Sequence, residues 1–574
     1  MFLKVTRSGP RTYLQIVRSY RDPATGKPKQ KHLPNLGRIE KLAATDLDAL
    51  IDGLLKVTGR PGLADRAEVE TEGVVFDRAL ELGDVWAVTK IWQQLKLAQS
   101  VSRQAEGRRL RIDVEQLIRV MVLNRLSDPC SKLGVLRWLE TVWLPGVDRA
   151  QMTHQNLLRA MDALLEHKDA LEKELASTLL PLFSTEMEVV FYDITALRVH
   201  GEAELEGDVR QYGKAKGVDA TVRQFAVGLV QTADGFPVSH EVFEGNVGET
   251  TTVKGMVTKL LARFPIKRLV LVADRGMLSM DNLDVIEALK LPGGRPVEYI
   301  LAVPARRCRE MTKDLAVLHR SLVEEARRTG AQAVAESEVD GRRLVVAHDV
   351  ELARQMRLRR ARALAEAARL ANRLAGRLID QQEGKPRRGR KLTDNGARVK
   401  LRDHLLEHHL TRIIRIDWED EVFCWDYDVE ELKRELMLDG KLVLVSNIQG
   451  IPAADVVTRY KSLADIERSF RVAKSTLELA PVYHRLPDRI RAHTLICFLA
   501  LVIHRVMQAR LRRASLALSP ERVLYMLKGV QKHRAQLASG TVLEGVTTIK
   551  AEQRRLFEAL DVDVPTLKEV TAAA

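Results

Sequence analysis

The spacing of apolar residues changes along this chain of 574 residues, and that change constrains the fold more than any other feature. From about residue 77 to residue 182, apolar side chains recur every three or four positions, which predicts amphipathic helices. From residue 187 to residue 304 they form short alternating or continuous runs, which predict strands. We expect strands at 188–197, 223–232, 236–243, 268–274 and 297–303, with helices at 251–264 and 281–289. This order predicts an α/β core with antiparallel opening hairpins and later strands joined by crossover helices.

A segment of different composition interrupts the core between residues 305 and 440. It contains a possible hairpin at 337–349, a long helix rich in Arg and Ala at about 350–382, and strand-like residues at 412–428. The apolar pattern then resumes in three segments that can return to the core: a strand at 441–447, a helix at about 453–477 and a strongly apolar helix at 489–511. The sequence therefore predicts a core that is split by an insertion.

The patterns together predict a multidomain α/β protein with a small N-terminal β unit and a helical domain before the core. Short apolar segments at 2–5 and 12–17 suggest the β unit. The predicted parts are a basic β unit and linker (1–75), a helical domain (76–182), the first part of the core (183–304), a basic α+β insertion (305–440), the second part of the core (441–515) and a C-terminal helical tail (516–574).

Positive charge is concentrated in two places. Residues 1–38 contain nine Lys or Arg and one Asp, residues 351–402 contain sixteen Lys or Arg and five acids, and the whole chain has a net formal charge of +14. Two separate basic patches are typical of contact surfaces for a polyanion, so nucleic acid is the leading partner. An anionic membrane surface is the alternative, but neither patch adds the Trp, Phe and Leu face of an interfacial helix.

The cysteines and the N-terminal residues favour a location in the reducing cytoplasm. The four cysteines, at positions 130, 308, 424 and 497, are far apart, so neither a zinc site nor a disulfide framework is expected. The first residues lack the apolar core of a signal peptide. The longest apolar run, at 495–503, is well short of the ~20 residues that cross a bilayer. We therefore expect a cytoplasmic protein with no membrane partner.

Three carboxylates occupy positions where chemistry could occur. Asp193 lies within a predicted apolar strand, and a lone buried carboxylate is costly unless it is paired or binds a metal. Asp274 ends a predicted strand, where α/β folds place ligand groups. Glu467 shares a seven-residue spacing, and hence a helix face, with Tyr460 and Lys474. Alternatively, Asp193 pairs with an arginine, Asp274 caps the next segment, and the polar heptad is a solvated face.

Three motifs carry a resemblance. VVFYDIT around Asp193, LVADRGMLS around Asp274 and Y-x2-L-x3-E-x6-K from Tyr460 to Lys474 resemble the DDE transposases of bacterial insertion sequences, in the subgroup whose third acid lies in a Tyr-Arg-Glu-Lys signature. The similarity covers 187–303 and 441–508, including GFPVSHEVFEGNVGET between the first two acids. It implies an RNase H-like catalytic core, a mixed sheet flanked by helices, with an insertion domain between the last core strand and the Glu-bearing helix.

The resemblance implies that Asp193, Asp274 and Glu467 are catalytic acids that bind two divalent ions. Three like charges in one pocket would raise one another's pKa values, whereas metal ions hold the ionised forms. All-oxygen ligands suit Mg²⁺ or Mn²⁺. Two ions ~4 Å apart can activate a water or a 3′-hydroxyl and stabilise the oxygen that departs in an in-line displacement at phosphorus. The implied reaction is hydrolysis at the element end, followed by attack of the released 3′-hydroxyl on target DNA.

DNA contacts are implied around the acids. Tyr460 and Lys474 match signature positions that contact DNA phosphates near the cleavage point, and Arg275 could hold phosphate too. One position departs from the signature, because Leu463 replaces its arginine; Arg459 or Arg471 could supply that cation. A half-buried ring for Tyr460 and a surface cation for Lys474 are the alternatives.

Aromatic and histidine residues of the insertion offer further candidates. By the resemblance, Trp418 and Trp425 could hold the element end and stack on an extruded base, although a tryptophan in an alternating strand is often part of a core. His404 and His408 have the helical spacing of metal ligands. No Glu directly follows the first histidine, so a solvated helix face is the preferred interpretation.

The resemblance also implies the partners, which are double-stranded DNA with terminal inverted repeats, target DNA and a second copy of the chain in the synaptic complex. The protein would then associate with the bacterial nucleoid. Two other functions remain open: a catalytically inert DNA-binding protein with a transposase fold, and a nuclease with the same core that does not join strands. The inert protein predicts the loss of an acid, yet all three acids are present.

Overall fold

The computed structural model describes residues 1–8, 11–23, 27–39, 42, 44–59, 74–105, 111–179, 189–199, 207–214, 221–264, 268–273, 283–291, 294–385, 390–537 and 539–572. The chain divides into two compact units. The first unit comprises Met1–Leu80 and Gln531–Thr548, and the second comprises Glu81–Val530 and Ile549–Ala574.

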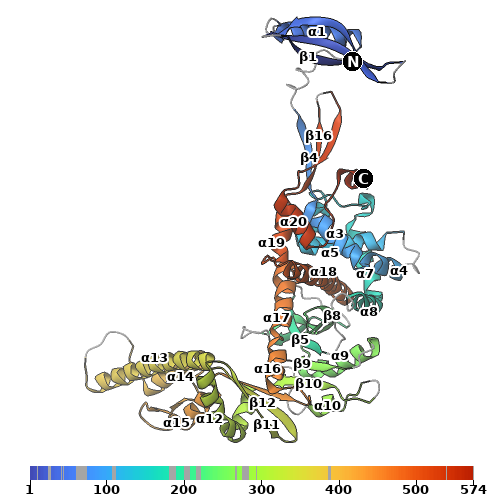
Figure 1. Cartoon of the computed structure of the whole chain (residues 1–574). Helices are drawn as coiled ribbons and strands as arrows, with labels where there is room; N and C mark the ends of the chain where they lie inside the picture. Colours follow the sequence, from blue (N-terminus) through green and yellow to red (C-terminus); the bar gives the residue numbers. More distant parts are fainter. Residues whose placement is uncertain are drawn as a thin grey trace. The chain divides into compact units, whose positions relative to one another are not determined.

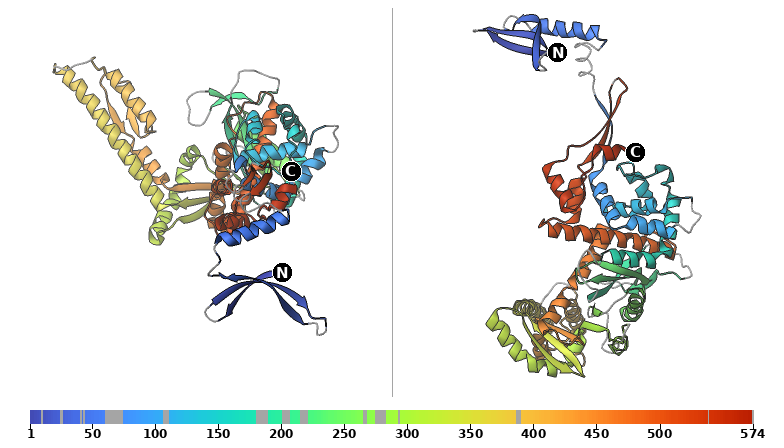
Figure 2. Two further views of the ribbon diagram at one scale, coloured as in Figure 1. Left: turned by 90° about the horizontal axis from the view of Figure 1, so that it is seen from above. Right: turned by 45° about the vertical axis from the view of Figure 1, so that its right-hand side comes forward.

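Among its described residues, the first unit contains a three-stranded antiparallel sheet, a second three-stranded sheet and a helix. The sheet of order β1-β2-β3 (dark blue in Figure 2) is formed by β1 (Phe2–Ser8), β2 (Arg11–Arg21) and β3 (Pro28–Arg38). The predicted strands are present as β1 and β2, whereas β3 was not predicted because its side chains are mostly polar and exposed. Helix α1 (Ala44–Val57) lies in the range that was expected to be β unit and linker.

The second sheet of this unit corrects two expectations. Its order is β17-β16-β4, from β4 (Val75–Glu81), β16 (Gln531–Gln536) and β17 (Val542–Val546). A strand therefore stands at the start of the range predicted to be helical, and a hairpin stands in the tail that was also predicted to be helical. Most side chains of β4 and β17 are exposed, so the apolar alternation that marks a strand is missing.

The second unit has a layer of helices built from α3 (Gly83–Gln94), α4 (Leu97–Ala105), α5 (Val114–Ser127), α6 (Lys132–Trp138), α7 (His154–Glu166), α8 (Lys168–Leu179), α18 (Pro487–Arg513), α19 (Pro520–Leu527), α20 (Ala551–Ala559) and α21 (Leu567–Ala572). Side chains fix where the helices begin. Asp113 accepts a hydrogen bond from the backbone N–H of Gln116, and Thr153 accepts one from that of Asn156, so each caps the helix that follows.

Helix α18 lies between α5, α7 and β8, and it contacts all three (Figure 1). It is long and apolar enough to cross a membrane, but 94% of its most apolar window is buried inside the protein. Side chains are buried around its whole circumference, which is the pattern of a core helix.

The core of the second unit is a nine-stranded mixed sheet. Its order is β11-β12-β15-β10-β9-β5-β7-β6, and β8 also pairs with β7. The strands are β5 (Val189–Arg198), β6 (Gln211–Lys214), β7 (Thr221–Thr232), β8 (Pro237–Glu244), β9 (Val270–Ala273), β10 (Glu298–Ala302), β11 (Ala333–Val339), β12 (Arg342–His348) and β15 (Lys441–Ser446). The core strands predicted from the apolar pattern are confirmed, and β6 is an addition.

Helices cover both faces of this sheet. On one face, Tyr192 and Ile194 of β5 pack in a core with Val253 and Met256 of α9 (Glu249–Arg263). The same core includes α10 (Leu283–Glu287) and α12 (Thr312–Thr329). On the other face, the ring of His240 in β8 stacks on Phe498 of α18 at a centroid distance of 4.6 Å. The predicted mixed sheet flanked by helices is therefore present.

The chain between β10 and β15 forms two different parts. The predicted hairpin is β11–β12, and it extends the core sheet because β12 pairs with β15, with His348 opposite Lys441. The remaining elements after the hairpin are α13 (Val350–Gln382), α14 (Asp394–Glu407), β13 (Ile414–Ile416), β14 (Trp425–Tyr427) and α15 (Val429–Leu438), and α11 (Ala305–Glu310) precedes α12. Helices α13 and α14 lie side by side (Figure 1) and share a small core of their own that includes Leu374 and Leu401.

Candidate active site

Asp193 lies near the middle of β5, a central strand of the nine-stranded sheet. β5 pairs in parallel with β9 and antiparallel with β7, and Asp193 stands opposite Leu229. The side chain of Asp193 is half-buried, and its Oδ1 accepts a hydrogen bond of 2.8 Å from the backbone N–H of Ile194. Thr195 is two residues further along, so its side chain points to the same face of the sheet as that of Asp193.

Asp274 and Arg275 lie outside the described residues. The strand that precedes them in sequence is β9, which ends at Ala273 and pairs Val272 with Phe191 of β5. The chain therefore approaches Asp274 from the strand that neighbours the one bearing Asp193.

The predicted helix at 453–477 is divided into three parts. These are α16 (Ala453–Lys461), α17 (Ala464–Arg471) and a π-helical turn (Val472–Thr476). Between α16 and α17 the chain tightens, because the N–H of Leu463 donates to the carbonyl of Tyr460, only three residues back, at 2.9 Å. The sequence predicted that Tyr460, Glu467 and Lys474 share one face of a regular helix. That prediction is wrong, because the tight turn and the wider π-helical turn each change the rotation from one residue to the next. Glu467 is exposed, whereas Tyr460 and Lys474 are half-buried.

Helix α17 and the π-helical turn pack on the sheet through two polar contacts. The ammonium group of Lys474 donates to Oγ1 of Thr195. The hydroxyl of Ser469 donates to Oε1 of the buried Gln231 at 2.8 Å. Gln231 is two residues from Leu229, the partner of Asp193, so it projects from the same face. The segment that carries Glu467 therefore covers the face of the sheet that bears Asp193.

Arg505 of α18 holds α17 from the other side, and the sequence analysis did not single it out. Its Nε donates to the hydroxyl of Ser469 at 3.1 Å, and its Nη2 donates to the carbonyl of Asp465 at 2.7 Å. Burial lowers the pKa of Arg505 to about 10, and the charge of Asp465 offsets part of that effect. The sequence did contain a signal for this residue, namely an arginine within a strongly apolar helix. A cation buried in such a helix needs hydrogen-bonding or charged partners.

The residues around Glu467 differ in exposure. Leu463, which stands at the arginine position of the signature, is only 5% exposed and therefore packs into the interior. Arg459 is half-buried, and its Nη1 has no hydrogen-bond partner among the described residues. Arg471 is exposed and lies one helical turn after Glu467.

The two tryptophans of the inserted elements have different environments. Trp418 is 48% exposed in the loop between β13 and β14, and the guanidinium carbon of Arg402 lies 6.0 Å from its ring centroid. Trp425 lies in β14, packs against the core shared by α13 and α14, and meets Tyr427 edge to face at 5.5 Å. Trp418 is therefore available to a partner, whereas Trp425 belongs largely to a core.

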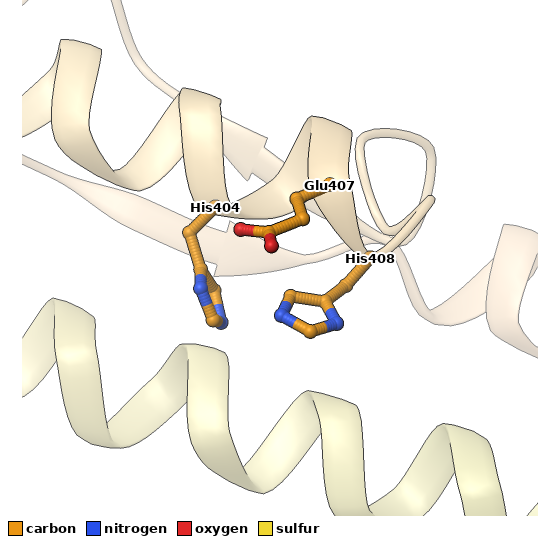
Figure 3. Close-up of side chains that lie close together, drawn as sticks. All are labelled: His404, Glu407 and His408. Carbon is orange, nitrogen blue, oxygen red and sulfur yellow. The ribbon is translucent and has the colours of Figure 1, made fainter. Parts of the chain in front are cut away.

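His404, Glu407 and His408 project from the same side of α14 and its C-terminal end (Figure 3). Their ligand atoms lie within 4.8 Å of one another, and the two histidine rings are 4.4 Å apart. Glu407 and His408 are exposed, and within the part of the chain that the structure describes no fourth donor joins them. Three donors from one exposed helix fall short of the four that close a structural zinc site.

The candidate site thus combines a half-buried carboxylate on a central strand with an acid-bearing helix that packs on the same face. Residues 184–503, more than half of the chain, match the family model of the transposase DDE domain. Residues 3–68 match the model of the N-terminal domain of IS1634 family transposases. No curated protein matches the chain.

The mixed sheet and the DDE-domain match define a DDE transposase, an enzyme of phosphoryl transfer with an RNase H-like domain. The chain belongs to the IS1634 family of these transposases. Such an enzyme binds DNA, cleaves it at the ends of an insertion sequence and transfers the strand. DDE transposases generally use divalent metal ions.

Proposed function

We propose that Asp193, Asp274 and Glu467 are the catalytic acids of this transposase and would hold two Mg²⁺ or Mn²⁺ ions. The observation that carries the proposal is the packing of the Glu467 segment on the face of β5 that bears Asp193, through the bond from Lys474 to Thr195. Asp274 is supported by its position in sequence directly after β9, the parallel neighbour of β5. The donor set fits, because all three groups are carboxylates and hard divalent cations prefer oxygen.

The residues of the chain have separate roles in this proposal. When bound, two divalent ions would activate the attacking oxygen and stabilise the departing one. The bond from the Ile194 N–H orients the Asp193 carboxylate, so that one of its oxygens has a fixed direction. The exposed Glu467 faces solvent, where DNA can reach it. Arg505 and Ser469 hold the Glu467 segment against the sheet and act through position rather than by contact with DNA.

We further propose that Tyr460, Lys474, Arg471 and Arg275 contact DNA phosphates. Arg471 is the better replacement for the missing signature arginine, because it is exposed and lies one turn after Glu467, whereas Arg459 is half-buried. The site is then a variant of the Tyr-Arg-Glu-Lys signature in which the cation has moved along the helix. Arg471→Ala should weaken binding of the cleaved end more than Arg459→Ala, measured on the same DNA duplex.

The other parts of the chain have supporting roles in this proposal. The basic N-terminal unit (1–75) and the helices of 76–182 would bind the terminal inverted repeats, and two copies of the chain would hold two ends in a synaptic dimer. Within the range 305–440, the elements from α13 to α15 would act as the insertion domain and touch the element end. Their own core, the arginines of α13 and the exposed Trp418 support this role.

The decisive test is cleavage and joining of a supercoiled plasmid that carries two native element ends, with Mg²⁺, with Mn²⁺ or with EDTA. Asp193→Asn, Asp274→Asn and Glu467→Gln should each lower the rate by at least about a thousandfold, since the ions supply several kcal/mol and each ~1.4 kcal/mol is tenfold. Asp455→Asn is the matched control, because Asp455 is an exposed carboxylate on the neighbouring helix α16. Cutting without joining would indicate a nuclease, and tight binding without cutting in either metal would indicate an inert protein.

A further inference from the structure

A cavity of about 800 Å³ lies within the second unit, between the helical layer and the chain that follows the π-helical turn. It is lined from α5, the loop before α6, the start of α6, α7, the segment 478–486 and α18. The lining residues used below are Arg125, Lys132, Glu478, Val482, His484 and Arg489. The cavity belongs to neither the candidate acids nor the inserted elements.

Two cations are buried at this cavity. Arg125 is 3% exposed and Lys132 is 6% exposed. Nη1 of Arg125 donates to the carbonyls of Leu477 and Glu478 at 3.4 and 3.3 Å, while its Nε is buried without a hydrogen-bond partner. Nζ of Lys132 makes no hydrogen bond or ion pair with the residues that the structure describes. Both side chains line the cavity, so a ligand there can reach them.

No carboxylate offsets these charges within the lining. Glu478 is the one acidic residue among the residues around the cavity, and its side chain is exposed. Arg489 is already paired with Asp162 at 3.3 Å. Burial and the charge of Arg125 lower the pKa of Lys132 to about 7, and burial and the charge of Lys132 lower that of His484 to about 4. Buried cations without a counter-charge are costly, so the arrangement favours an anion in the cavity.

The cavity is linked to the candidate active site through the backbone. The carbonyls that bind Arg125 belong to Leu477 and Glu478, directly after the π-helical turn that carries Lys474. Val482, in the cavity wall, forms a β-bridge with Val199. Val199 directly follows the last residue of β5 and stands six residues after Asp193, which at ~3.3 Å per residue is about 20 Å. That length corresponds to about six base pairs of duplex at 3.4 Å each.

We propose that this cavity binds a backbone phosphate of the transposon-end DNA, within about six base pairs of the cleaved bond, through Lys132 and Arg125; the distance rests on the proposed catalytic role of Asp193. A cavity of about 800 Å³ accommodates a group the size of a nucleotide, which is larger than a free inorganic ion. Guanidinium and ammonium groups are the usual partners of phosphate: guanidinium forms two parallel hydrogen bonds, and ammonium acts as a compact positive charge. The proposal adds a DNA contact that neither the signature residues nor the inserted elements supply.

The first test compares Lys132→Met with the wild-type transposase on a short duplex of the element end, in EDTA, by fluorescence anisotropy over a range of salt. The loss of one charge-assisted contact to phosphate should weaken binding about tenfold. It should also reduce the slope of log Kd against log salt by about 0.9. Because methionine removes an unpaired buried charge and keeps the volume, the melting temperature should stay the same or rise. Lys254→Met is the matched control and should change neither quantity, because Lys254 is an exposed lysine of α9, which covers the opposite face of the sheet from Asp193.

A second measurement maps the contact on the DNA. Neutral methylphosphonate linkages placed one at a time along the first ten base pairs should identify a phosphate near the sixth pair whose neutralisation weakens wild-type binding. Lys132→Met should be insensitive to that same linkage. An unchanged salt slope in Lys132→Met, or the absence of any such linkage in the scan, would overturn the proposal. Inorganic phosphate that stabilises the wild type but not Lys132→Met, with DNA binding unaffected, would show a free-anion site and would also overturn it.

Discussion

The ammonium group of Lys474 donates to Oγ1 of Thr195, two residues after Asp193 on the same face of β5. The bond joins a strand and a helix that are far apart in sequence, and it is made from within the π-helical turn. A π-helical turn widens the helix locally and rotates the residues that follow it, and such turns are frequent at functional sites. The turn therefore directs Lys474 toward the sheet, and the bond fixes the segment that also carries Glu467.

Thr195→Val removes the acceptor of this bond while the side chain keeps its shape. A hydrogen bond to a charged group contributes about 1.5–3 kcal/mol, so we expect the rate of end cleavage to fall at least about tenfold while DNA affinity changes little. Single-turnover cleavage and anisotropy on the same duplex measure the two effects. Thr458→Val is the control, because its hydroxyl bonds only to the carbonyl of Ala454 in its own helix. A Thr195→Val enzyme that cleaves at the wild-type rate would remove the bond from the catalytic argument.

Arg505→Met tests whether α18 positions the Glu467 segment. The change removes the donors to Ser469 and to the carbonyl of Asp465. We expect the free energy of unfolding to fall by about 2 kcal/mol, because buried acceptors lose their partners. We also expect the Mg²⁺ concentration for half-maximal cleavage to rise, which a purely structural loss would not cause. Arg491→Met, on the same helix but paired with Asp488 at the surface, should change neither quantity.

Trp418 and Trp425 should give opposite results when each is changed to alanine. Trp425 packs against the core shared by α13 and α14, so its loss should lower the free energy of unfolding by about 2 kcal/mol, less than a fully buried tryptophan would. Trp418 is exposed, so its loss should leave the unfolding midpoint unchanged and weaken binding of the element end. Urea unfolding and anisotropy, run on both variants, separate the two cases. Normal DNA binding by Trp418→Ala would show that Trp418 does not contact the element end.

The pH dependence of DNA binding should report on Lys132. Its pKa is about 7 in the free protein, and a bound phosphate must raise that value. Affinity should therefore be constant below pH 7 and fall as the pH rises from 7 toward the pKa of the bound state, by up to about tenfold per unit. Lys132→Arg stays charged throughout this range, so its affinity should not change with pH. A wild-type affinity that is flat between pH 6 and pH 9 would contradict the assignment.

Several groups around Lys132 have pKa values that are shifted away from that range. Burial keeps the pKa of His484 near 4 and that of His493 well below its usual value, so both rings stay neutral. Burial raises the thiol pKa of Cys130 and of Cys497, which favours their neutral forms. His154 and Tyr483 also line the cavity. Both are kept in Lys132→Arg, so a difference in pH dependence between the wild type and this variant isolates the contribution of Lys132.

Much of the core could be predicted from the sequence, because buried strands carry apolar runs. Asp193 was identifiable for the same reason, as a carboxylate within such a run. The helix at 453–477 could not be predicted in detail, because its tight turn and its π-helical turn depend on contacts with Thr195, Gln231 and Arg505 from other elements. The strands β3, β4 and β17 were missed because their exposed side chains lack an apolar period.

The candidate active site was predictable only in part. The acids stand in recognisable motifs, but Asp274 and Arg275 lie outside the described residues, so their placement stays a prediction. No sequence pattern predicted that Arg125 and Lys132 are buried together, because the segment that faces them comes more than three hundred residues later in the chain. Burial of a cation is a property of the assembled fold, and local sequence does not report it.

The pairing of His348 with Lys441 has a consequence for how this protein could have acquired its inserted elements. β12 and β15 are antiparallel neighbours, and the N–H of Asp349 donates to the carbonyl of Gly440 at 2.9 Å, so the chain leaves and re-enters the sheet at one point. In topological terms, residues 349–440 are a long connection between the two strands of a β-hairpin, in the place of a short turn. A two-residue Asn-Gly turn could close the same hairpin. The sheet can therefore gain, lose or exchange this module without a change of strand order.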